Sequence, residues 1–283
     1  PPPPHWPGPR AMRRLAVLDD PQTAALILHT AGQLAGRLGG ADICALHPIP
    51  ATDPDFQSPD EGLPDPAQQA RFAQDTATRA AAVQQIFTSW LSTESGAPRA
   101  RWTAQSGVPR TIVRLAAEHA DFVILGPASS TSTPATRQSF AAALYDAQAT
   151  VVIAPPTPLP GFGLHPVVAW QNTPNLIRAA NAALPLLQSA GRVHILVGEN
   201  QPDTVPEPAL LAQLRACGVA VTLERFLLTG HNVGAQIRAH ATQAGADLLV
   251  MGAYGRPHFV EWLFGGPTMD ILDHATWPIL TSH

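Results

Sequence analysis

Lysine is absent from this chain: all 17 of its basic residues are arginine. A Walker-type phosphate loop needs a lysine, so this class of nucleotide site is excluded, and any phosphate contact has to come from backbone N–H groups, hydroxyls or arginine. The net charge is only −4, shared as −2 in residues 1–160 and −2 in residues 161–283. This even balance leaves no basic face for nucleic acid, and we expect no nucleic-acid partner.

Cysteine is almost absent as well. Cys44 and Cys217 each stand alone in apolar surroundings, which indicates two small buried residues rather than a disulfide framework or a metal site. No apolar run approaches the roughly 20 residues that a membrane span requires. Residues 1–11 are rich in proline but lack the basic start and apolar core of a secretion signal. We therefore expect a disordered tail there, with a polyproline ligand as the alternative, and a cytoplasmic protein outside the membrane.

Catalytic motifs are also lacking. There is no G-x-S-x-G elbow, and no Ser–His–Asp or paired-carboxylate arrangement stands out. His231, His240, His258 and His274 have none of the close spacings that bind zinc, so we expect no metal site. The sequence thus favours a protein that is not an enzyme, with weak ATPase activity as the open alternative.

What the chain does contain is an internal repeat. The segment 120–126, ADFVILG, matches the segment 246–252, ADLLVMG, 126 positions later, and the same offset brings Ile153 onto Ile279. Two copies of one unit explain this match. A chain of 283 residues, of which 45% are hydrophobic, is long enough for two cores. We predict a first domain over residues 12–156, a linker rich in proline and glycine over 157–163, and a second domain over 164–283.

Strand-like and helix-like segments alternate along each copy, as in a parallel sheet covered by helices. Short unbroken apolar runs predict strands buried on both faces, whereas 219–226 alternates and indicates an edge strand. The proline-rich, acidic stretch 48–66 indicates a long surface loop. The expected helices are 21–38, 67–91, 110–119, 174–189 and 209–217. The expected strands are 15–18, 43–46, 99–104, 122–125 and 150–154 in the first copy, and 167–170, 193–197, 219–226, 248–251 and 277–281 in the second.

Glycines gather directly after the buried run 248–251. Gly252 ends the run, Gly255 follows three positions later, and Gly265 and Gly266 come after nine more residues. Glycines just past a buried strand indicate backbone that lies against something with no room for a Cβ. If that neighbour is a phosphate, the N–H groups of the loop and of the following helix supply donors and a favourable dipole.

The order of strand, G-x-x-G, nine residues, glycine pair, helix and last strand resembles the C-terminal signature of the universal stress protein family. The resemblance implies two tandem α/β domains, each a doubly wound, Rossmann-like parallel sheet with strand order 3-2-1-4-5. It also implies that the last strands of the two copies pair and form an internal pseudo-dimer. The implied function is a regulatory role in the stress response, with ATP or a related adenine nucleotide (ADP or AMP) as ligand and Mg²⁺ as a companion that the nucleotide can bring.

The same resemblance implies which residues of the second copy hold the nucleotide. Gln171 stands where the family usually has aspartate. Its side chain can still form hydrogen bonds with adenine or ribose, but it has no negative charge with which to assist a metal ion. Pro267 offers no N–H where the family places a donor. Core packing is the alternative role of the strand-end residues, and capping of the next helix is the alternative role of Thr268. The implied set is Gln171, Val197, Met251, Gly252, Gly255, Arg256, Gly265, Gly266 and Thr268.

The first copy has lost most of these glycines. It keeps Gly126, but Ser129 and Ser139 stand opposite glycines of the second copy. Asp19 or Asp20 matches the acid that the family carries after its first strand. We therefore expect the first copy to be a degenerate structural partner and the nucleotide to bind in the second. The rival interpretation is an interaction or scaffold module that has lost both sites and binds an unknown protein partner; a homodimer beyond the internal pseudo-dimer stays open.

Overall fold

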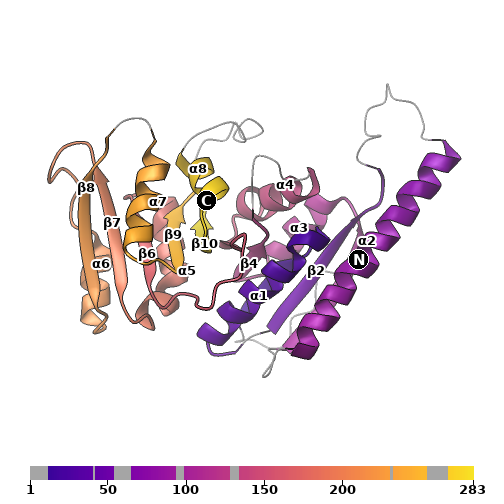
Figure 1. Ribbon diagram of the computed structural model, residues 1–283, viewed down its shortest axis with the longest axis horizontal. Helices are drawn as coiled ribbons and strands as arrows, with labels where there is room; N and C mark the ends of the chain where they lie inside the picture. The colour runs from indigo at the N-terminus through magenta and orange to yellow at the C-terminus, as the bar shows by residue number, and fades with distance from the viewer. Residues whose placement is uncertain are drawn as a thin grey trace.

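The computed structural model describes residues 12–40, 42–53, 65–93, 99–127, 134–229, 232–253 and 267–283, without the side chains of residues 267–269. Its centre is a ten-stranded sheet with the order β3-β2-β1-β4-β5-β10-β9-β6-β7-β8. In Figure 1 the first half of the chain forms the right side of the molecule and the second half the left side. The strands are β1 (Arg13–Val17), β2 (Asp42–Pro50), β3 (Arg99–Gly107), β4 (Phe122–Leu125), β5 (Val151–Ile153), β6 (Pro166–Trp170), β7 (Val193–Glu199), β8 (Val221–Leu227), β9 (Leu248–Gly252) and β10 (Ile279–Ser282).

Both halves of the sheet have the same topology. Strands β3-β2-β1-β4-β5 form one half and β8-β7-β6-β9-β10 the other, so each half has the order 3-2-1-4-5. Neighbouring strands within each half are parallel. The pair that joins the halves is antiparallel: Ile279 of β10 lies opposite Ile153 of β5, and Thr281 lies opposite Val151. The predicted fold and the pairing of the last strands are thus confirmed.

Several helices begin at a capping residue that the sequence places after a strand. Asp20 caps α1 by accepting a hydrogen bond from the N–H of Gln22, and Thr173 caps α5 by accepting one from the N–H of Leu176. A proline follows each of these caps. It occupies the first helical position, where an N–H group would have no partner within the helix, so its lack of an N–H costs no hydrogen bond. Asn232 caps α7 in the same way. The helices are α1 (Pro21–Arg37), α2 (Pro66–Thr93), α3 (Pro109–Ala117), α4 (Pro134–Ala141), α5 (Pro174–Gln188), α6 (Ala209–Ala216), α7 (Val233–Gln243) and α8 (Pro267–His274).

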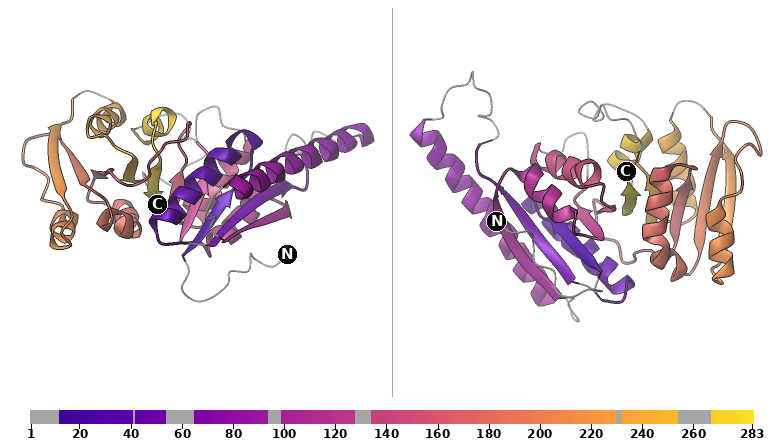
Figure 2. Two further views of the ribbon diagram at one scale, coloured as in Figure 1. Left: turned by 60° about the horizontal axis from the view of Figure 1, so that its bottom comes forward. Right: turned by 180° about the vertical axis from the view of Figure 1, so that it is seen from behind.

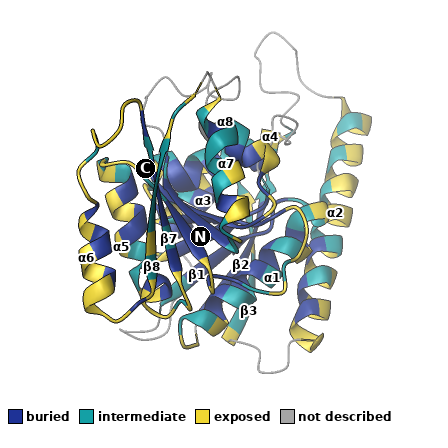
Figure 3. Ribbon diagram, turned by 60° about the vertical axis from the view of Figure 1, so that its left-hand side comes forward, coloured by how far each residue is buried: buried dark blue, intermediate teal, exposed yellow. Residues whose placement is uncertain are grey.

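Two hydrophobic cores lie on opposite faces of the sheet, because alternate strand residues point to opposite sides. Along β1, Ala16 belongs to the core under α1, α2, α5 and α6, while Leu15 and Val17 belong to the core under α3, α4, α7 and α8. Figure 2 shows helices on both faces, and in Figure 3 the strands in the middle of the molecule are buried. The apolar runs of β1, β4 and β9 are therefore covered from both sides, as predicted.

The halves differ in the helix that follows their second strand. α2 has 28 residues, whereas its counterpart α6 has 8. β2 continues to Pro50, so the surface loop expected over 48–66 begins later than predicted. Residues 54–64 of that loop lie outside the described part of the chain.

The halves differ again after their fourth strand. In the second half α8 begins at Pro267, but in the first half α4 begins at Pro134 and continues into a short π-helical turn, η3 (Ala142–Asp146). Ser139, which the repeat aligns with Gly265, therefore lies inside a helix and is buried. The position that corresponds to Gly265 is thus part of a helix in the first half.

The two cysteines do not have the same environment. Cys44 is buried, as predicted, but Cys217 is exposed. Cys217 follows the last turn of α6 as its C-cap, away from the inward face of that helix, and its Sγ accepts a hydrogen bond from Gln188 Nε2 at 3.4 Å. The prediction of a buried thiol is wrong for Cys217.

The β5–β10 junction contains a buried hydroxyl that can be removed. Thr281 is 4% exposed, and its hydroxyl has no hydrogen-bond partner among the described residues. We expect Thr281→Val to raise the free energy of unfolding by about 1 kcal/mol, because valine occupies similar space without burying a hydroxyl. Thermal unfolding would show this as a higher Tm.

Ser282→Ala is the matched control on the same strand. The Ser282 hydroxyl is hydrogen-bonded to the Thr150 hydroxyl at 3.2 Å, so this variant should lose stability. A lower Tm for Thr281→Val than for the parent protein would contradict the assignment of an unpaired hydroxyl.

Candidate functional site

A pocket opens at the carboxyl ends of β6, β7 and β9 in the second half. Ligands of open α/β sheets bind at this edge, at the point where the strand order reverses, and here the reversal lies between β6 and β9. The pocket has a volume of about 280 Å³, near the lower limit for small-molecule sites. Its lining comes from the strand ends, from α7 and from α8: Ala169, Trp170, Gln171, Leu196, Gly198, Asn200, Phe226, Leu228, Val233, Ile237, Met251, Gly252 and Ile271.

The lining is mostly apolar and carries amide groups. Phe226 and Met251 provide an aromatic and a flexible apolar wall, and Gln171 and Asn200 provide the amides. Both amide residues are exposed, so their side chains can meet a ligand that enters from solvent. No carboxylate lines the described part of this pocket. It therefore offers hydrogen bonds in both directions without charge.

Three residues of the predicted site meet in this pocket: Gln171, Met251 and Gly252. Val197 does not join them, because it is fully buried in the core on the other face of the sheet. Its neighbours Leu196 and Gly198 line the pocket in its place. Adjacent residues of a strand face opposite sides of the sheet. The alternation along β7 could therefore have shown that Val197 and its neighbours Leu196 and Gly198 lie on different faces.

The rest of the predicted site lies between β9 and α8 in the sequence or in α8 itself. Thr268 is the second residue of α8, and its roles in phosphate binding or in capping stay predictions. Pro267 occupies the first helical position, where its lack of an N–H removes one of the donors that a helix start would offer. The remaining four residues of the set lie outside the described part of the chain: Gly255, Arg256, Gly265 and Gly266.

Gly252 has a structural reason to be glycine that involves no ligand. A Cβ at this position would lie 2.8 Å from the backbone nitrogen of Leu176 and 3.2 Å from its Cα, in the first turn of α5. Gly126 in the first half also lies against a helix, since its Cβ would lie 3.0 Å from the side chain of Thr23 in α1. Asn175 also ties α5 to the end of β9, because its Nδ2 donates to the carbonyl oxygen of Ala253 at 2.7 Å. Close helix packing thus explains why both copies keep this glycine.

Gly252→Ala should therefore destabilise the protein whether or not a ligand is present. The new methyl group would press on backbone that has little freedom to move, and we expect a loss of about 1–3 kcal/mol in the free energy of unfolding. Chemical denaturation measures this loss. Gly36→Ala in α1 is the matched control, because nothing lies within 4 Å of its Cβ position and alanine favours the helix, so it should be neutral or stabilising. Equal stability of the two variants would contradict the packing role.

A second, larger pocket lies at the corresponding edge of the first half. It has a volume of about 580 Å³ and lies between the strand ends, the N-terminal half of α2 and the starts of α3 and α4. Of the two acids after β1, Asp19 lines this pocket, whereas Asp20 caps α1. His47 at the end of β2 lines it as well. The sequence prediction of a degenerate first copy did not include this pocket.

Burial determines the charge of the two inner groups of this pocket. Asp19 is 6% exposed, and the loss of water raises the pKa of its carboxyl to about 6, although the neighbouring Ser139 hydroxyl opposes the shift. Burial lowers the pKa of His47, so its ring is neutral near pH 7. The Nδ1–H of His47 donates to the carbonyl oxygen of Leu18 at 2.5 Å, which leaves Nε2 as an acceptor.

The raised pKa of Asp19 predicts how stability depends on pH. The folded protein holds this proton up to about pH 6, whereas the unfolded chain releases it near the ordinary pKa of 3.8, so the free energy of unfolding should fall as pH rises between these two values. Asp19→Asn removes this dependence. We expect the variant to match the parent near pH 4 and to exceed it by up to about 3 kcal/mol at pH 7. Urea denaturation at both pH values measures this, and a difference that does not change with pH would contradict it.

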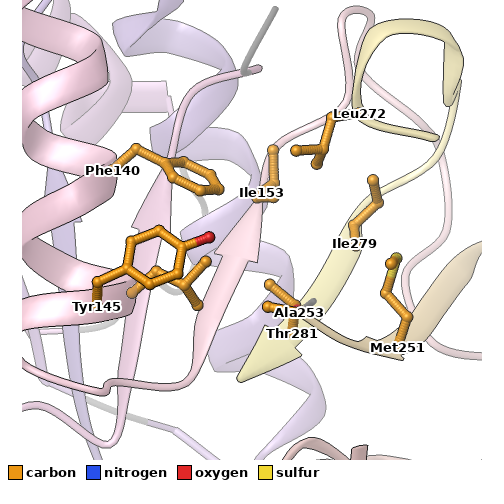
Figure 4. A pocket seen from close by; sticks show the side chains of 9 residues that line it. Phe140, Tyr145, Ile153, Met251, Ala253, Leu272, Ile279 and Thr281 are labelled. Atoms are coloured by element: carbon orange, nitrogen blue, oxygen red, sulfur yellow. The ribbon is translucent and has the colours of Figure 1, made fainter. Parts of the chain in front are cut away.

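A third gap, at the β5–β10 junction, is too small for a ligand. Side chains of both halves point into it, from α4, η3 and β5 on one side and from β9, β10 and α8 on the other (Figure 4). Its volume of about 10 Å³ is the space of a single water molecule at most. Its apolar lining belongs to the packing between the halves.

Two further features are absent from the described residues. No helix among them is long and apolar enough to cross a membrane. Within the same residues, no group of three or more histidines, cysteines and acids could hold a metal ion. The pockets of about 280 and 580 Å³ are the candidate sites in the described part of the chain.

A family profile resembles this chain in sequence, and solved structures resemble it in fold. A sequence profile of the universal stress protein family matches residues 123–283. A universal stress protein from Archaeoglobus fulgidus has a TM-score of 0.73 at 16% identity, over 95% of this chain and 94% of that one. A Pseudomonas aeruginosa structure with the same family name has a TM-score of 0.53 at 15% identity, over 95% of this chain and 92% of that one. No curated protein matches the chain in sequence.

The likeness to these structures establishes the fold alone, because the identities are low. The family profile adds evidence from sequence, and it covers more than half of the chain, including the whole second half with its pocket. The repeated strand order and the antiparallel pairing of the last strands agree with what the glycine signature implied. On these grounds the chain belongs to the universal stress protein family, which supports a role in the stress response.

Proposed function

We propose that this protein binds an adenine nucleotide in the pocket of its second half and acts in the stress response as a regulator rather than a catalyst. The observation that carries the proposal is the position of this pocket at the reversal of strand order, with Gln171, Met251 and Gly252 in its lining. Crevices at this point of doubly wound sheets are the usual place for nucleotides.

The lining suits an adenine base. Phe226 and Met251 give apolar walls for a flat ring, and the pocket volume of about 280 Å³ suits a base with part of its sugar. A glutamine side chain can donate and accept at the same time, which is the pattern that recognises N6 and N7 of adenine. Gln171 can therefore replace the acid that is usual at this position by reading the base directly.

The phosphates would lie beside the start of α8. The first turn of a helix leaves backbone N–H groups without partners, and they attract an anion together with the helix dipole. Ile271 of α8 lines the pocket, so this helix lies next to the proposed base site. Gly255, Arg256, Gly265 and Gly266 stay predictions for phosphate contacts. Since no carboxylate lines the described part of the pocket, Mg²⁺ would be held by the phosphates of the nucleotide.

Two observations favour the rival, an interaction module without a nucleotide. Gly252 is explained by its contact with α5, and Pro267 removes a donor from the start of α8. Neither residue therefore requires an anionic ligand. The two hypotheses differ in a direct binding measurement.

Isothermal titration of nucleotide-free protein with ATP, ADP and AMP tests the proposal. We expect binding, and we expect Gln171→Ala to weaken it by roughly 5- to 100-fold, because two hydrogen bonds to the base are lost. GTP should bind more weakly than ATP, since guanine presents acceptors at both of the corresponding positions. Gln213→Ala, an exposed glutamine on α6 outside the pocket, is the matched control and should bind like the parent. No heat with any nucleotide would reject the proposal in favour of the interaction module.

A further inference from the structure

The N-terminal half of α2 forms a wall that the second half of the molecule lacks. The buried residues of α2 are Val83, Phe87 and Trp90, all in its C-terminal half. The preceding turns extend past the sheet (Figures 1 and 2) and line the pocket of about 580 Å³. Core packing does not account for these turns, but they are what encloses the pocket.

This wall carries charges of both signs at helical spacing. Arg71, Asp75 and Arg79 follow one another at intervals of four residues, so they lie on one side of α2, and all three line the pocket. Neighbours at this spacing often pair with each other on a helix. Among the described residues, however, none of the three takes part in an ion pair. Their charges remain available to a ligand.

The opposite side of the pocket also offers both signs. Asp19 is almost fully buried there, and it lines the pocket together with His47 and Arg79. The start of α3 lines the pocket too, and its N-cap Val108 provides no side-chain cap, so N–H groups of the first turn are left for an anion. Arg110 is already engaged, because it forms two hydrogen bonds with Asp146, at 2.6 and 2.8 Å.

We propose that this pocket of the first half binds a small zwitterion of the amino-acid class, with its carboxylate toward Arg79, Arg71 and the start of α3 and its ammonium group toward Asp75 and Asp19. A ligand with a single charge would leave the groups of the other sign unpaired in a partly desolvated space. A zwitterion satisfies both sets. The volume of about 580 Å³ lies within the range of small-molecule sites and leaves room for a side chain beside Phe72.

A nucleotide does not fit the first half in the manner proposed for the second. There Ser139 and Phe140 occupy the positions that align with Gly265 and Gly266, and both are buried within α4. The inference is therefore independent of the nucleotide proposal, and each can fail without the other.

Saturation-transfer NMR of the full chain against the twenty free L-amino acids, followed by titration of those that respond, tests this inference. We expect at least one amino acid to bind. Its N-acetyl derivative, which has lost the ammonium group, and its carboxamide, which has lost the carboxylate, should each bind roughly tenfold more weakly or worse. Arg79→Gln and Asp75→Asn should each cause a loss of similar size.

Arg215→Gln is the matched control, because Arg215 is an exposed arginine on α6, the counterpart of α2. It should bind like the parent protein. If none of the twenty amino acids gave a saturation-transfer signal, the inference would be overturned. Equal binding of the capped derivatives would overturn it as well, and so would unchanged binding by Arg79→Gln, which would move the site away from α2.

Discussion

The architecture depends on a short antiparallel pairing of β5 with β10, in which three residues of each strand face each other. This pairing turns two five-stranded sheets into one, and both hydrophobic cores continue across it. Without it, the apolar residues of β5 would form an open sheet edge that could pair with other chains. The gap of only about 10 Å³ beside the junction indicates that side chains of the two halves fill the space between them.

On this common frame the two halves have acquired different pockets. The strands fix where a pocket can form, since both pockets open at the carboxyl ends of parallel strands. The helices decide its size and charge. In the second half the short α6 leaves a small pocket with amide groups, whereas the long α2 encloses a larger and charged one. Sequence identity between repeats is therefore a poor guide to where ligands bind, because the lining comes from segments that changed in length.

The sequence predicts the strands and the repeat well, because apolar runs buried on both faces depend on local composition. Features that depend on which way a residue faces, or on what packs against it, were harder to foresee. Val197 was predicted for the pocket, but its neighbours Leu196 and Gly198 are the residues that face it. Cys217 was predicted to be buried from its apolar neighbours in the sequence, but it lies exposed at the end of α6. The contact of Gly252 with α5 joins segments that are distant in the chain, so no local sequence pattern could predict it. The charges at intervals of four residues on α2 were visible in the sequence, but only the fold shows what they face.

The sheet ends at β3 and β8, and the alternation that indicated an edge strand at β8 is thus confirmed. Both outer strands carry charged residues: Arg99 and Arg101 in β3, and Glu224 and Arg225 in β8. A charged edge opposes the docking of a further strand, because the added backbone would bury those charges. The chain thereby pairs its apolar edge strands β5 and β10 with each other, while the strands that end the sheet carry charges.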